Sequence, residues 1–314
     1  MRVFDAEQTS AALPFDLLIP ALRARFAAGC VVPTRGVHEI VSPGGGVVTS
    51  LLMPAWVAGQ CYGVKVINIA PGNGARGLPG LHATYLLHDA DTGVPLALLD
   101  GNAITARRTA AASALAASML ARDNARHLLV LGAGRVARLL PAAYRCVRGI
   151  ARVSVWTRRA AQAEALVLQL QADGFDAHAV TDLSAAVATA DIVSCATLAT
   201  EPVLHGAWLR PGSHLDLIGS FTPAMREADD ACFAGAALYL DSEEALVKSG
   251  DLLGPLARGV ITPASVRGTL ATLVRGAAAG RSSDDQRTVF KSVGTALEDL
   301  AAAMLAVRWS GGPG

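Results

Sequence analysis

A glycine-rich turn is the clearest chemical signal in the sequence. The apolar run at residues 127–131 leads into Gly132-Ala133-Gly134-Arg135-Val136-Ala137, which fits the pattern G-x-G-x-x-A, and a helical pattern follows. In this pattern the first glycine permits a tight turn, the second lets the backbone approach a pyrophosphate, and the last small residue lets helix and strand pack closely. The N-terminus of the helix supplies N–H donors to the phosphates. The turn therefore predicts a dinucleotide site, with a plain glycine turn as the alternative.

The end of the next predicted strand, residues 153–156, bears on the choice of dinucleotide. Thr157, Arg158 and Arg159 follow it, and no Asp or Glu is present there. NAD is recognised by a carboxylate that accepts from the ribose 2′-hydroxyl, whereas a 2′-phosphate requires cations and donors. NADP(H) is therefore favoured, and NAD(H) stays an alternative because the two arginines could also form an ordinary solvated helix start.

The elements that must position this turn alternate along the chain. Helices are predicted at 160–171 and 183–188, and a strand at 177–180. Short apolar runs bounded by Gly, Pro or Asp continue the rhythm at 192–195, 215–218 and 238–240. This alternation predicts an α/β fold with a Rossmann-type, doubly wound parallel sheet over residues 122–287.

The flanking segments differ from this pattern. Strands at 46–53 and 62–69, separated by turn clusters, indicate a mixed sheet, and residues 105–121 form an Ala-rich helix. Residues 284–309 are also predicted to be helical, with one apolar stripe that must pack elsewhere. We expect that helix to return to the first part of the chain, so residues 1–121 with 288–314 form a discontinuous α+β domain. The glycine-rich end at 311–314 lies outside the helical pattern.

Composition limits the classes of partner. The 314 residues are 52% hydrophobic and 17% charged, which predicts a folded chain rather than a disordered one. The net charge of +1 provides no field for nucleic acid or an anionic membrane. Prolines and glycines interrupt the long uncharged stretch at 40–64, so no membrane span is expected there despite a mean hydropathy of +0.39. With Asp5 and Glu7 where a secretory leader would carry cations, the expected location is the cytoplasm.

Short motifs spread along nearly the whole chain carry a family resemblance. They are Lys65 with Pro71-Gly72-Asn73 and Gly77-Leu78-Pro79, then residues 91–97, 99–101, 105–111 and 132–134, Pro223 with Arg226-Glu227 and Asp229, and finally 290–294. Together they resemble the ornithine cyclodeaminase and μ-crystallin family. The resemblance implies a Rossmann domain, a homodimer joined through the N-terminal domain, and chemistry on a small amino acid or imino acid at the carbon next to its carboxylate. It makes 1–121 with 288–314 the substrate-binding and dimerisation domain, and 122–287 the dinucleotide-binding domain.

The resemblance also implies site residues. Arg35 and Lys65 look like the family's substrate-carboxylate ligands, and Arg108 like the arginine beside them that approaches the cofactor. A guanidinium can hold a carboxylate bidentately, and an ammonium can pair with charge and deliver a proton. The alternatives are a loop arginine, a solvated strand lysine and a helix-surface arginine.

The remaining predicted contacts fall into two sets. For the substrate pocket we expect Arg35 and Lys65 with His82 and Phe221; the seven histidines are dispersed without metal-ligand spacing, so no metal is expected. For the cofactor we expect Gly132, Gly134, Arg135, Val136, Thr157, Arg158, Arg159, Thr197, Ser292 and Val293.

One segment departs from the cyclodeaminase pattern. Phe221 stands where the cyclodeaminases carry an aspartate thought to act on water or substrate, and a phenyl ring cannot do acid/base work. The segment looks more like the μ-crystallin branch, whose members reduce cyclic ketimines. Glu227, Asp229 and Asp230 lie close in sequence and stay open as substitutes. A second difference is Gly80, where the cyclodeaminases place a threonine.

Two reactions follow from these observations. In the first, hydride passes from NADPH to the imine carbon of a small cyclic ketimine carboxylate, such as pyrroline-2-carboxylate or piperideine-2-carboxylate, with Lys65 as the proton source. In the second, an ornithine cyclodeaminase, NAD⁺ oxidises the amine, ammonia leaves and the reduced cofactor is reused. The first is favoured because the second explains neither Phe221 nor the arginines after Trp156. Oxidation of alanine or an N-alkyl amino acid, and crystallin-like dinucleotide binding without catalysis, are further alternatives.

Overall fold

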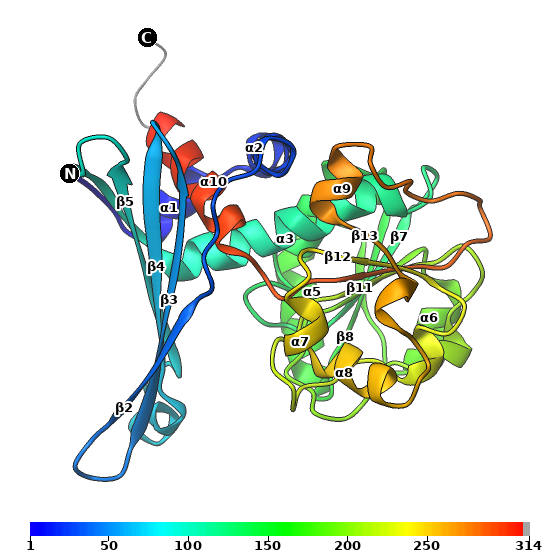
Figure 1. The fold of residues 1–314 in the computed structure, drawn as a ribbon. Coiled ribbons are helices and arrows are strands. Elements are labelled where there is room, and N and C mark those ends of the chain that lie inside the picture. The colour runs from blue at the N-terminus through cyan, green and yellow to red at the C-terminus, as the bar shows by residue number, and fades with distance from the viewer. Residues whose placement is uncertain (310–314) are drawn as a thin grey trace. The chain divides into compact units, whose positions relative to one another are not determined.

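Two β-sheets, each with its own helices, account for the fold of residues 1–309, the part of the chain that this computed structural model describes (Figure 1). The first unit comprises Met1–Arg108 and the segment that begins at Thr295, and the second comprises Thr109–Gly294. One boundary therefore lies inside helix α3 (Gly101–Leu120). Residues 310–314, the end of the expected first domain, lie outside the described residues. The functions expected for the two parts stay predictions.

The first unit is built on a six-stranded mixed sheet in the order β1-β6-β5-β4-β3-β2. Strand β1 pairs parallel with β6, and the other neighbours are antiparallel. Side chains of β4 alternate between the faces, so Gly63, Lys65 and Ile67 are buried together. This period of two places a lysine on the core face of the sheet. The strands are β1 (Arg2–Phe4), β2 (Gly36–Val41), β3 (Val47–Val57), β4 (Cys61–Ile69), β5 (Leu81–Asp89) and β6 (Pro95–Asp100).

Helix α10 (Ala296–Trp309) packs against α2 and against strands β3, β4 and β5 (Figure 1). The helix predicted from residue 284 is wrong in its first half, because residues 288–291 form strand β14 of the second sheet and the helix begins at 296. The β-branched and aromatic residues Thr288, Val289 and Phe290 favour a strand, and Gly294, with a φ of 77°, separates it from the helix. The other helices of this unit are α1 (Ala6–Ala11), α2 (Phe15–Ala28) and η1 (Pro71–Arg76).

The second unit contains an eight-stranded parallel sheet in the order β13-β12-β14-β11-β10-β7-β8-β9. Its first five strands in chain order have the spatial order 3-2-1-4-5 of a dinucleotide-binding fold. The predicted doubly wound sheet is confirmed. The strands are β7 (His127–Leu131), β8 (Arg152–Trp156), β9 (Ala177–Ala179), β10 (Ile192–Cys195), β11 (His214–Leu217), β12 (Ala237–Leu240), β13 (Val266–Thr269) and β14 (Thr288–Lys291).

The helix after the glycine turn starts later than predicted. Residues 135–139 form turns, and α4 spans only Leu140–Arg145. Pro141 explains the late start, because a proline is tolerated in the first turn of a helix but clashes with the preceding turn in its interior. Within residues 1–309, no helix combines the length and apolar character needed to span a membrane. The remaining helices are α5 (Ala160–Ala172), α6 (Leu183–Thr189), η2 (Gly206–Trp208), η3 (Asp230–Cys232), α7 (Ala245–Lys248), α8 (Gly250–Ala257), η4 (Pro263–Ser265) and α9 (Leu270–Val274).

Candidate active site

A buried cluster of four charged side chains lies in the first unit. Lys65 Nζ, from β4, is 2.6 Å from a carboxylate oxygen of Asp299, in the first turn of α10. Arg108, from α3, donates through Nε to the other oxygen of Asp299 at 3.0 Å and through Nη1 to Glu298 at 2.7 Å. Lys65 also donates to the hydroxyl of Thr105 at 3.3 Å. Two predicted catalytic residues, Lys65 and Arg108, therefore share one carboxylate.

Burial and charge set the protonation of this cluster. Lys65 is fully buried, and burial lowers the pKa of its ammonium from 10.5 to about 8 against the opposing attraction of Asp299. Burial raises the pKa of Asp299, but Lys65 and Arg108 together outweigh it, so that pKa lies below its ordinary value. With all four groups ionised the cluster is electrically balanced. Lys65 consequently can lose or supply a proton near neutral pH.

Tyr85 shares the buried face with Lys65, its cross-strand neighbour on β5. Its hydroxyl is buried, has no hydrogen-bond partner within residues 1–309, and packs over Gly63, where an added Cβ would lie 2.1 Å from the hydroxyl oxygen. Burial, with the nearby charge of Asp299, holds the pKa of Tyr85 well above its ordinary value. A glycine at position 63 is therefore required for this phenol to reach its position.

Sequence reasoning missed the two acidic members of the cluster. A signal was present, since Glu298 and Asp299 interrupt an otherwise apolar helical stripe. Two other predicted pocket residues belong to this unit. Arg35 immediately precedes β2 and is half-buried, and His82 is exposed on β5. Neither is one of the four residues of the cluster.

In the second unit the glycine turn has the backbone that a dinucleotide requires. Gly132 adopts a φ of 113°, and a Cβ there would lie 2.5 Å from the carbonyl oxygen of Ala196, at the end of β10. Gly134 is exposed and faces open space where a Cβ would point. The turn thus lies between β7 and β10, where the strand order reverses and such folds bind their ligands. These residues fit a pyrophosphate that approaches over Gly134, with Arg135 exposed and Val136 half-buried beside it.

The residues after β8 include two exposed cations. Arg158 and Arg159 are exposed, and no ion pair with a carboxylate is formed by either within the described chain. The Thr157 hydroxyl is buried and donates to the carbonyl of Arg159 at 2.6 Å. In this conformation Thr157 therefore orders the turn, while the two guanidinium groups face solvent.

Three further predicted contacts lie at the carboxyl ends of other strands. Thr197 follows β10, and its N–H and hydroxyl both donate to Glu227 at 2.7 Å. Ser292, after β14, donates its N–H to the Leu217 carbonyl, and the N–H of Val293 donates to Asp241 at 2.8 Å. These three predicted cofactor residues thus lie on turns that buried acceptors hold in place.

Phe221, just after β11, is 43% exposed, and the three carboxylates left open as its substitute are all occupied. Glu227 is fully buried and bound by N–H groups. Asp229 accepts from the N–H groups of residues 206 and 232, and Asp230 pairs with Arg226 and Arg258. Each of these carboxylates therefore has a structural role in the second unit.

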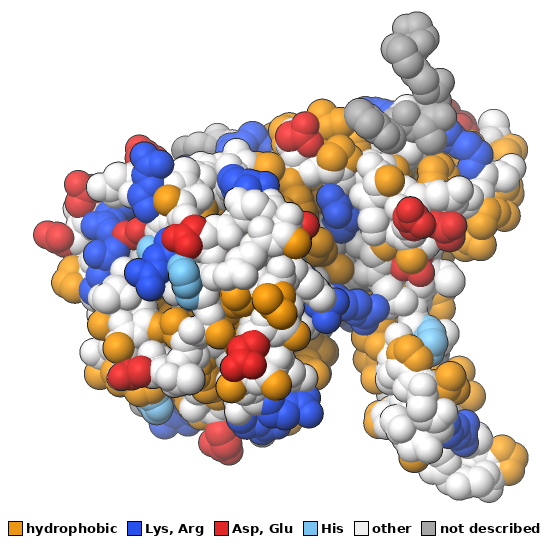
Figure 2. All heavy atoms as spheres, turned by 180° about the vertical axis from the view of Figure 1, so that it is seen from behind, with side chains coloured by type: hydrophobic (Ala, Val, Ile, Leu, Met, Phe, Trp, Pro, Cys, Tyr) orange, Lys and Arg blue, Asp and Glu red, His pale blue; other side chains and the backbone are white. Residues whose placement is uncertain are grey.

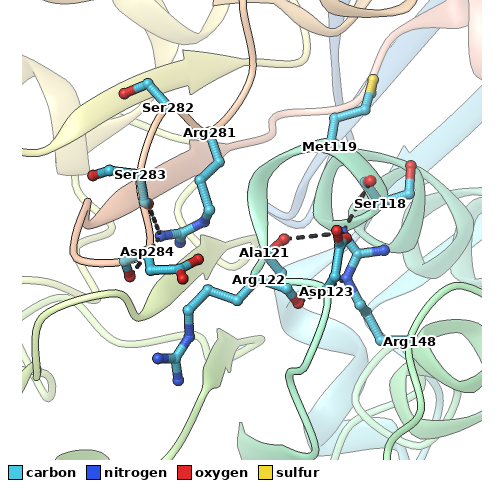
Figure 3. A pocket seen from close by; sticks show the side chains of 10 residues that line it. All are labelled: Ser118, Met119, Ala121, Arg122, Asp123, Arg148, Arg281, Ser282, Ser283 and Asp284. Carbon is cyan, nitrogen blue, oxygen red and sulfur yellow. Dashed lines mark hydrogen bonds and ion pairs between the residues drawn. The ribbon is translucent and has the colours of Figure 1, made fainter.

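The second unit also contains a polar cavity of about 290 Å³, which Figure 3 shows from close by. Arg122, Arg148 and Arg281 line it, near the amino ends of the strands and away from the glycine turn. Arg148 donates to the carbonyls of residues 118 and 121, and Arg281 to that of residue 120. Arg148 and Arg281 thus satisfy carbonyls at the C-terminal end of α3, and the cavity lies at the end of the sheet opposite the glycine turn. Among the residues that the structure describes, no three or more His, Cys, Asp or Glu side chains gather as metal ligands.

Comparison with known proteins places the chain in a family. The sequence model of the ornithine cyclodeaminase/mu-crystallin family matches residues 22–310, so the chain belongs to this family and the resemblance is confirmed. The Delta(1)-pyrroline-2-carboxylate reductase of Paracoccus denitrificans is 50% identical over 262 residues, 83% of each chain. The ketimine reductase mu-crystallin of Mus musculus is 35% identical over 307 residues, 95% of this chain and 93% of its own.

A solved structure is similar over almost the full length. It is the Delta(1)-pyrroline-2-carboxylate reductase of Thermococcus litoralis in complex with NADH and L-proline, with a TM-score of 0.92 and 32% identity. The match covers 99% of this chain and 97% of that one. Family and fold are thus established together.

Proposed function

We propose that this protein reduces a small cyclic ketimine carboxylate, such as pyrroline-2-carboxylate, to the cyclic amino acid with hydride from a nicotinamide dinucleotide. Relatives named as reductases of this substrate class, at 50% and 32% identity, support the proposal. The observation that carries it against amine elimination is the state of the carboxylates near Phe221. Glu227 is fully buried, and Asp229 and Asp230 accept from N–H and guanidinium groups of the fold, which disfavours all three as the base that elimination would need.

Reduction requires little from the protein beyond charge and a proton. When bound, the nicotinamide supplies the hydride. Lys65, with its pKa of about 8, is protonated at neutral pH and donates to the imine nitrogen. Asp299 keeps that ammonium oriented, and Lys65 and Arg108 together keep Asp299 ionised. We assign the substrate carboxylate to Arg35 together with Lys65, as the family resemblance implies, because a guanidinium can hold a carboxylate bidentately.

We also propose that NADPH is preferred over NADH. Two exposed arginines, Arg158 and Arg159, follow β8, and the ribose-reading position carries no carboxylate. A 2′-phosphate would accept charge-assisted hydrogen bonds from the guanidinium groups, whereas a 2′-hydroxyl would gain little. The preference is expected in kcat/KM for the dinucleotide.

A parallel assay tests the function. Purified protein is given NADPH or NADH with pyrroline-2-carboxylate or piperideine-2-carboxylate, and separately NAD⁺ with ornithine. We expect NADPH consumption with formation of proline or pipecolate, and no ammonia from ornithine. Ammonia release from ornithine would overturn the assignment, and dinucleotide binding without turnover of either imine would favour a binding protein.

A homodimer joined through the first unit is the expected assembly. Strand β2 is an edge of its sheet, and the hairpin of β2 and β3 exposes Val37, Ile40, Val41 and Val47. Figure 2 shows hydrophobic side chains along this hairpin. Exposed apolar edges of this kind favour pairing with another chain. Light scattering should therefore give twice the chain mass, and Ile40→Asp should lower it; a wild-type monomer would contradict the assignment.

A further inference from the structure

Glu227 is a fully buried carboxylate that no step of the proposed reaction uses. One oxygen accepts from the N–H and the hydroxyl of Thr197, both at 2.7 Å, and the other accepts from the N–H of Gly219 at 2.6 Å. Thr197 follows β10 and Gly219 follows β11, so a single side chain joins the turns at the carboxyl ends of two neighbouring strands. Such ends form the ligand crevice of a doubly wound sheet.

The joined turns are in close contact with each other and with the glycine turn. A Cβ on Gly219 would lie 2.0 Å from the carbonyl oxygen of Thr197, and one on Gly132 would lie 2.5 Å from that of Ala196. The three turns after β7, β10 and β11 therefore pack backbone against backbone. A shift of the middle turn, which Glu227 holds, must displace the glycine turn or open a gap beside it.

The backbone of Glu227 is itself held in place. Asp251, on α8, accepts from the N–H groups of Glu227 and Ala228 at 2.7 and 3.1 Å, and Lys291, on β14, lies 3.3 Å from Asp251. Glu227 therefore occupies a fixed position, with its two oxygens directed at the turns. This arrangement differs from that of a general base, which needs access to substrate or water.

We infer that Glu227 is a positioning residue for the dinucleotide site, one whose ionised carboxylate fixes the turns that carry Thr197 and Phe221 against the glycine turn. The inference rests on the proposed dinucleotide chemistry. Glu227 thus acts on cofactor binding through the turns and takes no part in proton transfer. The affinity for the cofactor should therefore depend on whether this one carboxyl is ionised.

The surroundings make that ionisation sensitive to pH. Burial raises the pKa of the Glu227 carboxyl, Lys291 lowers it, Asp251 raises it and the donors of Thr197 lower it, with a net value of about 7. The thiol of Cys195, at the end of β10, also faces this charge. A protonated carboxyl has one O–H donor, so one of its oxygens would oppose an N–H instead of accepting from it. Dinucleotide affinity should therefore fall as pH decreases through about 7.

The test compares the binding of NADH and NADPH to wild type and to Glu227→Gln, measured by protein fluorescence. The titrations run from about pH 6 to about pH 8, a range that brackets the pKa of Glu227. NADH is essential because it lacks the 2′-phosphate, and phosphate monoesters titrate near pH 6 themselves. We expect the amide to bind NADH about tenfold more weakly than wild type at pH 8, from loss of one charge-assisted hydrogen bond, and with a flat pH profile. Glu227→Asp should recover part of the pH dependence.

Asp216→Asn is the matched control. Asp216 is an equally buried carboxylate of β11, but its partners are the hydroxyls of Ser113, Tyr144 and Ser194 rather than any turn. That variant should keep the wild-type affinity and pH profile for NADH. A Glu227→Gln protein with wild-type affinity, or a wild-type protein whose NADH affinity is flat through pH 7, would overturn the inference alone. If wild type bound neither dinucleotide, the proposed function would fail and the inference with it.

Discussion

Replacing Asp299 by Asn should move the pH dependence of the reaction. The carboxylate is 2.6 Å from Lys65 Nζ, so at an effective dielectric constant of about 20 their attraction is about 6 kcal/mol. Loss of even a quarter of it, about 1.5 kcal/mol, lowers the pKa of Lys65 by about one further unit, from about 8 to about 7 or below. Because removal of one partner of a buried ion pair typically costs about 3–5 kcal/mol, the free energy of unfolding should fall by that order.

The assay is kcat/KM for pyrroline-2-carboxylate as a function of pH, with urea unfolding in parallel. Lys65 must be protonated to donate, so the wild-type rate should fall as pH rises through about 8, and the Asp299→Asn rate should fall about one unit earlier. Asp216→Asn, a buried carboxylate of the second unit, should leave this alkaline limb in place. If the Asp299→Asn protein lost stability but its kcat/KM still fell near pH 8, the assignment of Lys65 as the proton donor would be refuted.

Three further predictions concern the second unit. Replacing Arg158 and Arg159 together by Ala should lower kcat/KM for NADPH by about tenfold or more and leave that for NADH nearly unchanged; equal losses would contradict 2′-phosphate recognition. Burial raises the pKa of Asp216 from 3.8 to about 6, so the native state binds this proton more tightly than the unfolded state. The free energy of unfolding should then fall by up to about 3 kcal/mol between about pH 4 and pH 6, and Asp216→Asn should remove that slope in urea titrations. Gly132→Ala, whose Cβ would lie 2.5 Å from a carbonyl oxygen, should lose roughly 1–3 kcal/mol of stability and most NADH binding, whereas Gly134→Ala, which faces open space, should keep the wild-type stability.

Local sequence is sufficient to predict the two strands next to the glycine turn. Strands β7 and β10 span the predicted residues 127–131 and 192–195, because each is a short apolar run buried on both faces and bounded by turn residues. The prediction of a helix at residues 288–291 is wrong, because local sequence is not sufficient there. A four-residue run has no clear period, and what makes it a strand is its place between β11 and β12, which only the assembled sheet supplies.

The partners of Lys65 were beyond sequence reasoning for a similar reason. Lys65 and Asp299 lie near opposite ends of the chain and meet because α10 packs against β4. The spacing of apolar residues predicts that such a helix must pack somewhere, but not which turn of it faces which strand. The family resemblance could therefore nominate Lys65 and Arg108, whereas the carboxylate that shifts the protonation of Lys65 could be assigned only from the contacts.

The distribution of buried charge explains why the chain is suited to reduction. In the first unit two cations and two carboxylates balance, which leaves one lysine able to exchange a proton near neutral pH. In the second unit the buried carboxylates of Glu227, Asp241 and Asp251 all accept from backbone N–H groups of turns or helix ends. Withdrawing a carboxylate from such N–H donors costs several kcal/mol, so these three side chains serve to hold the turns and helix ends in place. Imine reduction needs a proton donor and no carboxylate base, and this arrangement of charge is consistent with such a reaction.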